Sequence, residues 1–328
     1  MSQQNRSEAS QLLRDLNWLP HGTKVVNVAI AGAGNMNLVE RVSLDNGTSL
    51  ILKRAQGWVE KYPHIPAPVG RAAVEAAFYA AVAGSSVGAK MPTHLGFDER
   101  NAANLLQDLG ECTDGMTAYA GTKITDGELD AVADWAAGLH VLPLAGSIKN
   151  TLNNRAMREL NAVHIFDFPL AVDNGFDLEE ITPGLQAAAN VLQTDRDFIA
   201  AVQPIKALYL GDAPDGVLLH GDLYPGSWLN TSQGLFMIDP EFCWLGPREW
   251  DVGMVLAHLR LSQQPAQQSA RFIRRYGQPI DRALANKVAG IEIMRRLLGV
   301  AQLPISMDCS AKITLLHEAR ALVLGISP

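Results

Sequence analysis

The sequence predicts an α+β fold of two lobes: a small N-terminal lobe with an antiparallel sheet and one main helix, and a larger, mostly helical C-terminal lobe. Three observations predict it. Alternating apolar runs separated by turn residues fill 25–53, helical periodicity dominates after Gly127, and two short apolar runs inside the helical part each end in an acidic residue. We expect the lobes to comprise 1–108 and 109–328.

Composition limits the classes of function. The chain has 328 residues, 48% of them hydrophobic and 19% charged, with a net charge of −7, which is ordinary for a globular protein. Without a Lys/Arg tract, a nucleic-acid partner is not expected. No apolar run reaches the ~18–20 residues of a membrane span, and the polar N-terminus has no signal-peptide core. Three dispersed cysteines without zinc-site spacing favour free thiols in a reducing cytoplasm.

The N-terminal lobe begins with an expected amphipathic helix at 8–16, followed by strands at 25–30, 38–44 and 48–53. The segment 31–37, Ala-Gly-Ala-Gly-Asn-Met-Asn, joins the first two strands, and Asp-Asn-Gly is a hairpin signal before the third. This order is typical of a kinase nucleotide-binding sheet, whereas a dinucleotide-binding fold requires a helix directly after the glycines. Gly32 and Gly34 permit close approach of a phosphate to the backbone, although an ordinary turn also explains them.

A lysine and a glutamate in this lobe are candidates for an ion pair. Lys53 ends an apolar strand, and Glu75 lies among alanines in the expected helix 69–82. Taken alone, Lys53 could extend to solvent and Glu75 could be a solvated helix position. In a kinase, a lysine at this place contacts the α- and β-phosphates and pairs with a glutamate of the next helix.

The remaining small-lobe elements are a loop and two strands. Three prolines and two aromatic residues make 57–68 an ordered loop, in which Trp58 could pack the lobe. Strands are expected at 95–97 and 103–106, and the segment 104–111 then leads into the second lobe.

Helical patterns dominate the C-terminal lobe. His140 ends the first helix, where a capping role explains it. The remaining unpatterned segment is 166–174. Helices are expected at 128–141, 151–163, 185–191, 195–209, 250–261, 271–276 and 282–298.

The candidate catalytic stretch is formed by two apolar runs, 217–219 and 235–238. Turn residues between them predict that the runs fold side by side, which brings Asp222, Ser227, Asp239 and Glu241 into one pocket. Such a pocket suits phosphoryl transfer, because one carboxylate can accept the proton of a hydroxyl while oxygen ligands hold Mg²⁺. The alternative is a buried hairpin whose acidic residues cap turns, but the second acidic motif argues against it.

The motifs His-Gly-Asp-Leu-x-x-Gly-Ser (220–227) and Asp-Pro-Glu (239–241) resemble those of the aminoglycoside phosphotransferase and choline kinase superfamily, with the S-methyl-5-thioribose kinases most similar. Gly-Asn-Met-Asn-Leu-Val (34–39) and Arg-Arg-x-x-Gly (295–299) also resemble that subfamily. The resemblance implies a protein-kinase-like bilobal fold and a homodimer. It also implies that Asp251 braces the catalytic loop and that the loop around Trp58 lies near the phosphates.

The resemblance assigns roles to further residues. Phosphates are expected at Gly32, Gly34, Asn35, Asn37 and Lys53 with its partner Glu75, and adenine near Leu106 and Gln107. Asp222 is expected to act as the base, Asp239, Glu241 and Ser227 to hold Mg²⁺, and Arg295 and Arg296 to neutralise the transferred group, although a solvated helix face also explains the two arginines.

The expected function is an ATP-dependent, Mg²⁺-dependent small-molecule kinase acting on a hydroxyl, with 5-methylthioribose as the best candidate substrate. Another sugar, an amino alcohol or an aminoglycoside of the same superfamily is the alternative acceptor. A nucleotide-binding pseudokinase and a purely structural helical protein are alternatives of a different class.

Overall fold

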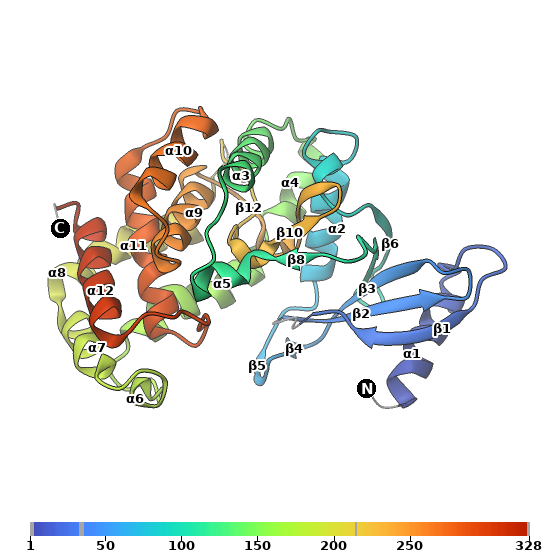
Figure 1. Ribbon diagram of the computed structural model, residues 1–328, viewed down its shortest axis with the longest axis horizontal. Helices are drawn as coiled ribbons and strands as arrows, with labels where there is room; N and C mark the ends of the chain where they lie inside the picture. Colours follow the sequence, from blue (N-terminus) through green and yellow to red (C-terminus); the bar gives the residue numbers. More distant parts are fainter. Residues whose placement is uncertain (1–2, 33–35, 214, 327–328) are drawn as a thin grey trace.

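The computed structural model describes residues 3–32, 36–213 and 215–326. A sheet at one end of the molecule stands beside a larger helical body, and short strands lie between them (Figure 1). We call the elements up to β7 the small lobe and the later elements the large lobe. The α+β architecture expected from the sequence is therefore present.

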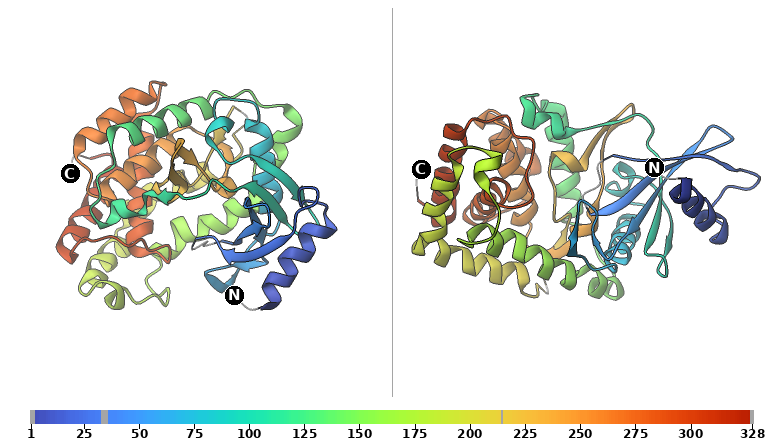
Figure 2. Two further views of the ribbon diagram at one scale, coloured as in Figure 1. Left: turned by 45° about the vertical axis from the view of Figure 1, so that its right-hand side comes forward. Right: turned by 90° about the horizontal axis from the view of Figure 1, so that it is seen from below.

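The small lobe is built on a five-stranded antiparallel sheet in the order β1-β2-β3-β7-β6. Its strands are β1 (Val25–Ile30), β2 (Asn37–Leu44), β3 (Ser49–Ala55), β6 (His94–Asp98) and β7 (Ala103–Gln107). Helix α1 (Gln3–Asp15) covers one face of the sheet (Figure 2), where Ala9 and Leu13 pack in a small core with Val28, Val42 and Leu52. The apolar positions that alternate along the strands thus bury against this helix.

Helix α2 (Arg71–Val82) runs between the sheet and the large lobe (Figure 1). It buries Val74, Phe78 and Val82 in the main core, which is shared with the large lobe. Its position brings Glu75 beneath β3, so one helix contacts both the sheet and the catalytic region.

The segment 57–68, predicted to be an ordered loop, instead contains a short hairpin of β4 (Trp58–Val59) and β5 (Tyr62–Pro66). A hydrogen bond from Ala67 N to Gly57 O, 3.0 Å long, closes its base. The prolines are compatible with strands here because the ladder has only two strands and each keeps an unpaired edge. Trp58 is 43% exposed, so it does not pack the lobe core.

The large lobe is mostly helical, as expected. Its helices are α3 (Asp126–Leu139), α4 (Gly146–Leu152), α5 (Arg155–Ala162), α6 (Leu178–Ile181), α7 (Leu185–Thr194), α8 (Arg196–Leu210), α9 (Glu249–Leu261), α10 (Ala266–Tyr276), α11 (Arg282–Leu298) and α12 (Cys309–Leu324). Helix α12 was not predicted from the sequence. Within the described residues, no helix combines the length and the apolar character needed to cross a membrane.

The single helix predicted at 151–163 is wrong, because the chain breaks between α4 and α5. Asn154 adopts a positive φ of 50° at the break. Its side-chain amide donates to the backbone oxygens of Glu241 and Cys243, both at 2.9 Å. These two buried hydrogen bonds compensate the cost of the left-handed conformation, which asparagine tolerates better than most residues.

The predicted pairing of 217–219 with 235–238 is also wrong. Strand β9 (Val217–Leu219) pairs with β12 (Trp244–Gly246), whereas β10 (Trp228–Thr231) pairs with β11 (Gly234–Met237). A third strand, β8 (Thr113–Asp114), adds to β10. Thr231 faces Gly234 across a two-residue turn. Strand β11 therefore pairs with β10, the strand that directly precedes it in the sequence.

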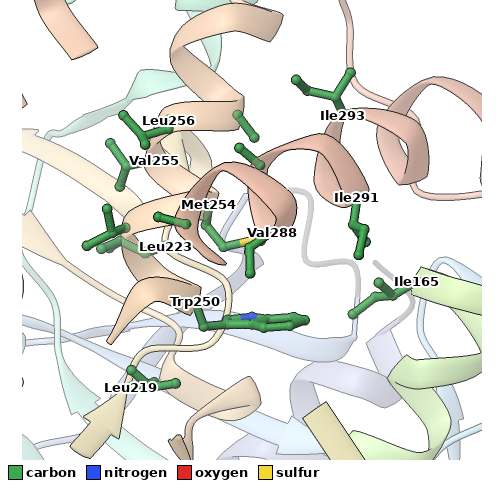
Figure 3. Packing of buried hydrophobic residues seen from close by; sticks show 14 of the residues in the cluster. Ile165, Leu219, Leu223, Trp250, Met254, Val255, Leu256, Val288, Ile291 and Ile293 are labelled. Atoms are coloured by element: carbon green, nitrogen blue, oxygen red, sulfur yellow. The ribbon is translucent and has the colours of Figure 1, made fainter. Parts of the chain in front are cut away.

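Helices α9 and α11 form the centre of the large-lobe core. Figure 3 shows Trp250 and Met254 of α9 beside Val288 and Ile291 of α11. The helices pack closely, because a Cβ added at Gly253 would come within 2.6 Å of the Val288 Cβ. Helix α11, whose C-terminal turn carries the two arginines, is therefore packed tightly against α9.

Candidate active site

A cavity of about 670 Å³ receives side chains from both lobes. The small lobe contributes residues of its sheet, of α2 and of the β4–β5 hairpin, and the large lobe contributes the segment after β9, the tip of β11 and the end of α11. Of the predicted site residues, those lining the cavity are Gly32, Lys53, Glu75, Leu106, Gln107, Asp222, Asp239, Arg295 and Arg296. One interlobe cavity thus collects most of the predicted site.

The ion pair expected between Lys53 and Glu75 is formed, with 2.9 Å between Nζ and a carboxylate oxygen. Both side chains are buried, and Lys53 also contacts Asp239. Burial alone disfavours the charged lysine, but the adjacent carboxylates outweigh it and raise the pKa of Lys53 well above its ordinary value. Lys53 therefore presents a permanent positive charge at the wall of the cavity.

Asp239 is held in an unusual backbone conformation, with φ at 67° and ψ at 51°. A non-glycine residue in this region is strained by about 1–2 kcal/mol, and such residues often cluster at functional sites. Its side chain is 49% exposed, and it lines the cavity. Burial raises the pKa of this carboxyl, but the charge and hydrogen bond of Lys53 outweigh it, so the pKa lies below its usual range.

Glu241 and Ser227, the other predicted metal ligands, are not among the cavity-lining residues. Glu241 is buried and accepts a hydrogen bond from Asn37 Nδ2 at 2.8 Å. The Ser227 hydroxyl donates to Tyr224 O at 2.8 Å and accepts from Tyr224 N at 3.2 Å. A metal-binding role for these two residues stays a prediction, and their present contacts do not favour it.

The donor chemistry nevertheless fits a magnesium ion. No three His, Cys, Asp or Glu side chains in the described part of the chain are grouped closely enough to form a metal cluster. Mg²⁺ usually takes one or two carboxylates, with substrate phosphates and water as the remaining ligands. Asp239, exposed in the cavity beside Lys53, offers such a carboxylate.

The segment after β9 is braced by Asp251 of α9, as the sequence analysis expected. Its carboxylate accepts hydrogen bonds from His220 N at 2.7 Å and Gly221 N at 2.9 Å. His140 is 3.1 Å from the same carboxylate, and its other ring nitrogen bonds the Tyr276 hydroxyl at 2.7 Å. His140 thus supports the brace in addition to ending α3.

We expect Asp251→Asn to lower the free energy of unfolding by about 2–4 kcal/mol, because a buried, hydrogen-bonded carboxylate is lost. Burial raises the pKa of Asp251, but hydrogen bonds from His140 and Gly221 outweigh it and place the pKa below its ordinary value. Its stabilisation is therefore present above about pH 4 and is lost as the pH falls through the lowered pKa. Denaturant unfolding at pH 7 and pH 3 should show the wild-type advantage shrinking in acid; an advantage independent of pH would contradict the brace.

Gly221 cannot be replaced without moving the segment after β9. Its φ is +84°, and an added Cβ would lie 2.0 Å from Phe242 O. We expect Gly221→Ala to destabilise the protein by about 3 kcal/mol, from left-handed strain and overpacking together. Thermal unfolding measures this effect, with Gly110→Ala as control, since that glycine also has a positive φ but nothing lies within 4 Å of its added Cβ. Equal losses in both variants would contradict the steric argument.

Asp222 faces the arginines of α11. Arg296 Nη2 is 3.0 Å and Arg295 Nη1 is 3.8 Å from Asp222 Oδ1. The guanidinium carbon of Arg296 lies 5.1 Å from the centroid of the Tyr224 ring. The two arginines are therefore buried beside Asp222 at the wall of the cavity and are not a solvated helix face.

A buried glutamate beneath the arginines was missed by the sequence analysis. Glu292 contacts Arg295 at 3.1 Å and also binds Arg296. Burial disfavours the charge of Arg296, but Glu292 and Asp222 outweigh it and raise the pKa of this side chain. The spacing of three and four residues from the arginines places Glu292 on the same helix face, a signal that was present in the sequence.

The segment joining the lobes is fixed by contacts that the sequence did not indicate. Asp108 binds Arg41 at 2.6 Å and accepts a hydrogen bond from Ser49 at 2.6 Å. The Gln107 N–H, near which adenine was expected, donates to Thr93 O at 2.9 Å. A nucleotide contact at Gln107 therefore has to use another group of that residue.

The glycine-rich loop is described only in part. Gly32 lines the cavity and has a φ of +75°, whereas the predicted Gly34 and Asn35 lie outside the described residues. Asn37 is buried and does not line the cavity. Its amide oxygen accepts from Arg71 Nε at 2.9 Å, so the structure gives it a supporting place behind the loop.

A two-lobed α+β fold with a lysine–glutamate pair and two acidic loops facing one interlobe cavity is the organisation of a kinase-like phosphotransferase. The chain belongs to the phosphotransferase enzyme family, whose model matches residues 28–286.

The individual relatives of the chain are distant in sequence, at 28% and 24% identity. The chain is 28% identical over 262 residues to a methylthioribose kinase of Exiguobacterium sibiricum, covering 74% of this chain and 63% of that protein. It is 24% identical over 279 residues to a methylthioribose kinase of Bacillus cereus, covering 81% and 68%. The chain thus spans 63% of the first relative's length.

Solved structures share the fold. A spectinomycin phosphotransferase in complex with ADP and spectinomycin superposes with a TM-score of 0.57 at 15% identity, covering 97% of each chain. A choline kinase from Streptococcus pneumoniae superposes with a TM-score of 0.54 at 13% identity, covering 97% of this chain and 98% of that chain.

Proposed function

We propose that the protein is an ATP-dependent kinase that transfers the γ-phosphate to a hydroxyl of 5-methylthioribose. The phosphotransferase family supports the reaction class, and the methylthioribose kinase relatives support the sugar. The observation that carries the choice of acceptor is the chemical character of the cavity beyond Asp222.

This end of the cavity, which we call the acceptor end, is where the β4–β5 hairpin meets the chain after α11. Tyr62 OH donates to Val300 O at 3.1 Å across the two segments. The cationic and polar residues here are Lys61, Tyr62, Asn161, His164, Arg295, Arg296 and Gln302. The apolar residues are Val59, Ile65, Leu160, Val300, Ala301, Leu303 and Pro304.

Among the described lining residues of 59–65, 160–164 and 295–304, none is acidic. A cationic acceptor such as choline or an aminoglycoside would find no acidic partner among these residues, because Asp222 and Glu292 are already paired with Arg295 and Arg296. A neutral sugar can donate hydroxyl hydrogen bonds to Asp222 and Asn161 and place an apolar substituent against the aliphatic side chains. 5-Methylthioribose has both features.

The residues have complementary roles in the proposed reaction. Asp222 orients the acceptor hydroxyl and takes its proton, while Lys53 and the backbone near Gly32 hold the ATP phosphates. Arg295 and Arg296 neutralise charge on the transferred group. Asp239 would hold Mg²⁺, which supplies further charge neutralisation on the phosphates when bound. The expected homodimer stays a prediction.

The test is steady-state ATP turnover with a panel of 5-methylthioribose, ribose, homoserine, choline and an aminoglycoside. We expect the highest kcat/KM for 5-methylthioribose. Ribose, which lacks the apolar substituent, should be about 10- to 200-fold poorer, the range of discrimination that a hydrophobic contact provides. A cationic acceptor that outperforms both sugars would refute the assignment while keeping the reaction class.

A further inference from the structure

A buried arginine at the start of α2 ties together three segments of the small lobe. Arg71 is 1% exposed. Its Nη1 donates to Gln56 O at 2.9 Å and Pro68 O at 2.8 Å, and its Nη2 donates to Met36 O at 2.8 Å. The guanidinium therefore fixes the beginning of β2, the end of β3 and the entry to α2 at once.

The same guanidinium reaches the large lobe through Glu241. Arg71 Nε is 3.4 Å from Glu241 Oε2, and Asn37 bridges the two side chains. Asn37 accepts from Arg71 Nε at 2.9 Å and donates to Glu241 Oε2 at 2.8 Å. The backbone oxygen of Glu241 is held in turn by Asn154 at 2.9 Å. Each side chain of this trio is at least nine-tenths buried.

Glu241 therefore contacts Arg71 and Asn37, two buried residues that do not line the cavity. Removing its carboxylate would leave the Arg71 charge without its nearest counter-charge in a buried site, which is a large cost. Asp239, two residues earlier, is half-exposed in the cavity. The two carboxylates of the acidic motif lie close enough to interact, but they differ in exposure: Glu241 is buried against Arg71 and Asn37, whereas Asp239 faces the cavity.

We propose that Arg71, Asn37 and Glu241 form an interlobe latch that sets the strand following the glycine-rich loop against the loop carrying Asp239. In this assignment Glu241 is a positioning residue, and Asp239 alone of the motif contacts the metal. The inference rests on the proposed function, because the latch serves to align the phosphate-binding backbone with the metal-binding carboxylate.

The test is calorimetric binding of ADP by the protein across a range of Mg²⁺ concentrations, which needs no acceptor and no turnover. The variants are Arg71→Lys, Glu241→Gln, their double mutant and Asp239→Asn. Arg54→Lys is the matched control, because Arg54 pairs with buried Glu40 at 2.8 Å within the small lobe and neither residue lines the cavity. Circular dichroism identifies variants that fail to fold.

We expect Glu241→Gln to leave the Mg²⁺ concentration for half-maximal ADP binding within about twofold of wild type, whereas Asp239→Asn raises it at least about tenfold. At saturating Mg²⁺, Arg71→Lys and Glu241→Gln should each weaken ADP binding about tenfold, with no further loss in the double mutant, because both break one coupled unit. Arg54→Lys should stay within about twofold of wild type.

A Mg²⁺ requirement in Glu241→Gln that matches Asp239→Asn would overturn the latch and make Glu241 a metal ligand. Additive losses in the double mutant, or an Arg54→Lys loss as large as that of Arg71→Lys, would also overturn it while leaving the proposed kinase intact. Failure of the wild-type protein to bind ADP with Mg²⁺ would refute the proposed function, and the latch with it.

Discussion

Asp222→Asn should lower kcat for phosphoryl transfer by about 10³-fold, within the range for loss of a general base. The amide keeps the size of the side chain but cannot accept the proton of the acceptor hydroxyl. Arg296, 3.0 Å away, also loses the carboxylate that holds its guanidinium over the reaction site. Because the residues proposed to hold the phosphates, Lys53 and Gly32, lie elsewhere along the cavity wall, ADP affinity should change little.

Asp114→Asn is the matched control for this prediction. Asp114 also lines the cavity but lies on β8, and it caps a turn by accepting from Met116 N at 3.0 Å, which an asparagine can also do. We expect this variant to retain kcat within about threefold, as for a surface charge change. Rapid-quench measurement of the chemical step compares the two variants. An Asp222→Asn rate within tenfold of wild type would contradict the assignment of Asp222 as the base.

Asp239→Asn should reduce kcat/KM for ATP by at least about 10³-fold, because an electrostatic contact to the phosphates and metal is lost from an enclosed site. The fold should persist. Asparagine tolerates the left-handed conformation that residue 239 adopts at φ 67°, and the buried Lys53–Glu75 pair remains in place.

Asp239→Ala provides the comparison that separates chemistry from strain. Alanine removes the carboxylate and is also disfavoured at positive φ, so it should lose stability in addition to activity, by about 1 kcal/mol relative to asparagine. Thermal unfolding without nucleotide measures this difference. Wild-type ATP kinetics in Asp239→Asn, or equal stability of the two variants, would contradict the account of this residue.

The sequence was informative where chemistry and local periodicity agreed. Lys53 and Glu75 could be paired in advance because each stands on an element with clear periodicity and because the lysine–helix glutamate pair is a recurrent kinase arrangement. The bracing role of Asp251 was implied by the family resemblance, and its hydrogen bonds to His220 N and Gly221 N agree with it. The helix 282–298, with continuous apolar periodicity and an N-terminal Asp, was placed correctly at both ends.

Contacts between distant segments could not be predicted. The pairing of β9 with β12 depends on competition among several short apolar runs, which periodicity does not rank. The break at Asn154 is stabilised by carbonyl groups almost ninety residues later in the chain. Arg71 gives no sign in the sequence of being buried, because its partners are mostly backbone oxygens.

Transfer of a phosphoryl group to 5-methylthioribose can be tested by analysis of the reaction products. Purified protein would be incubated with ATP, Mg²⁺ and 5-methylthioribose, and the products would be examined by phosphorus NMR and mass spectrometry. We expect ADP and a sugar monophosphate, phosphorylated on the anomeric hydroxyl, in equal amounts. Binding of ADP without formation of any phosphorylated sugar, from 5-methylthioribose or ribose, would contradict the claim and indicate a nucleotide-binding protein without this activity.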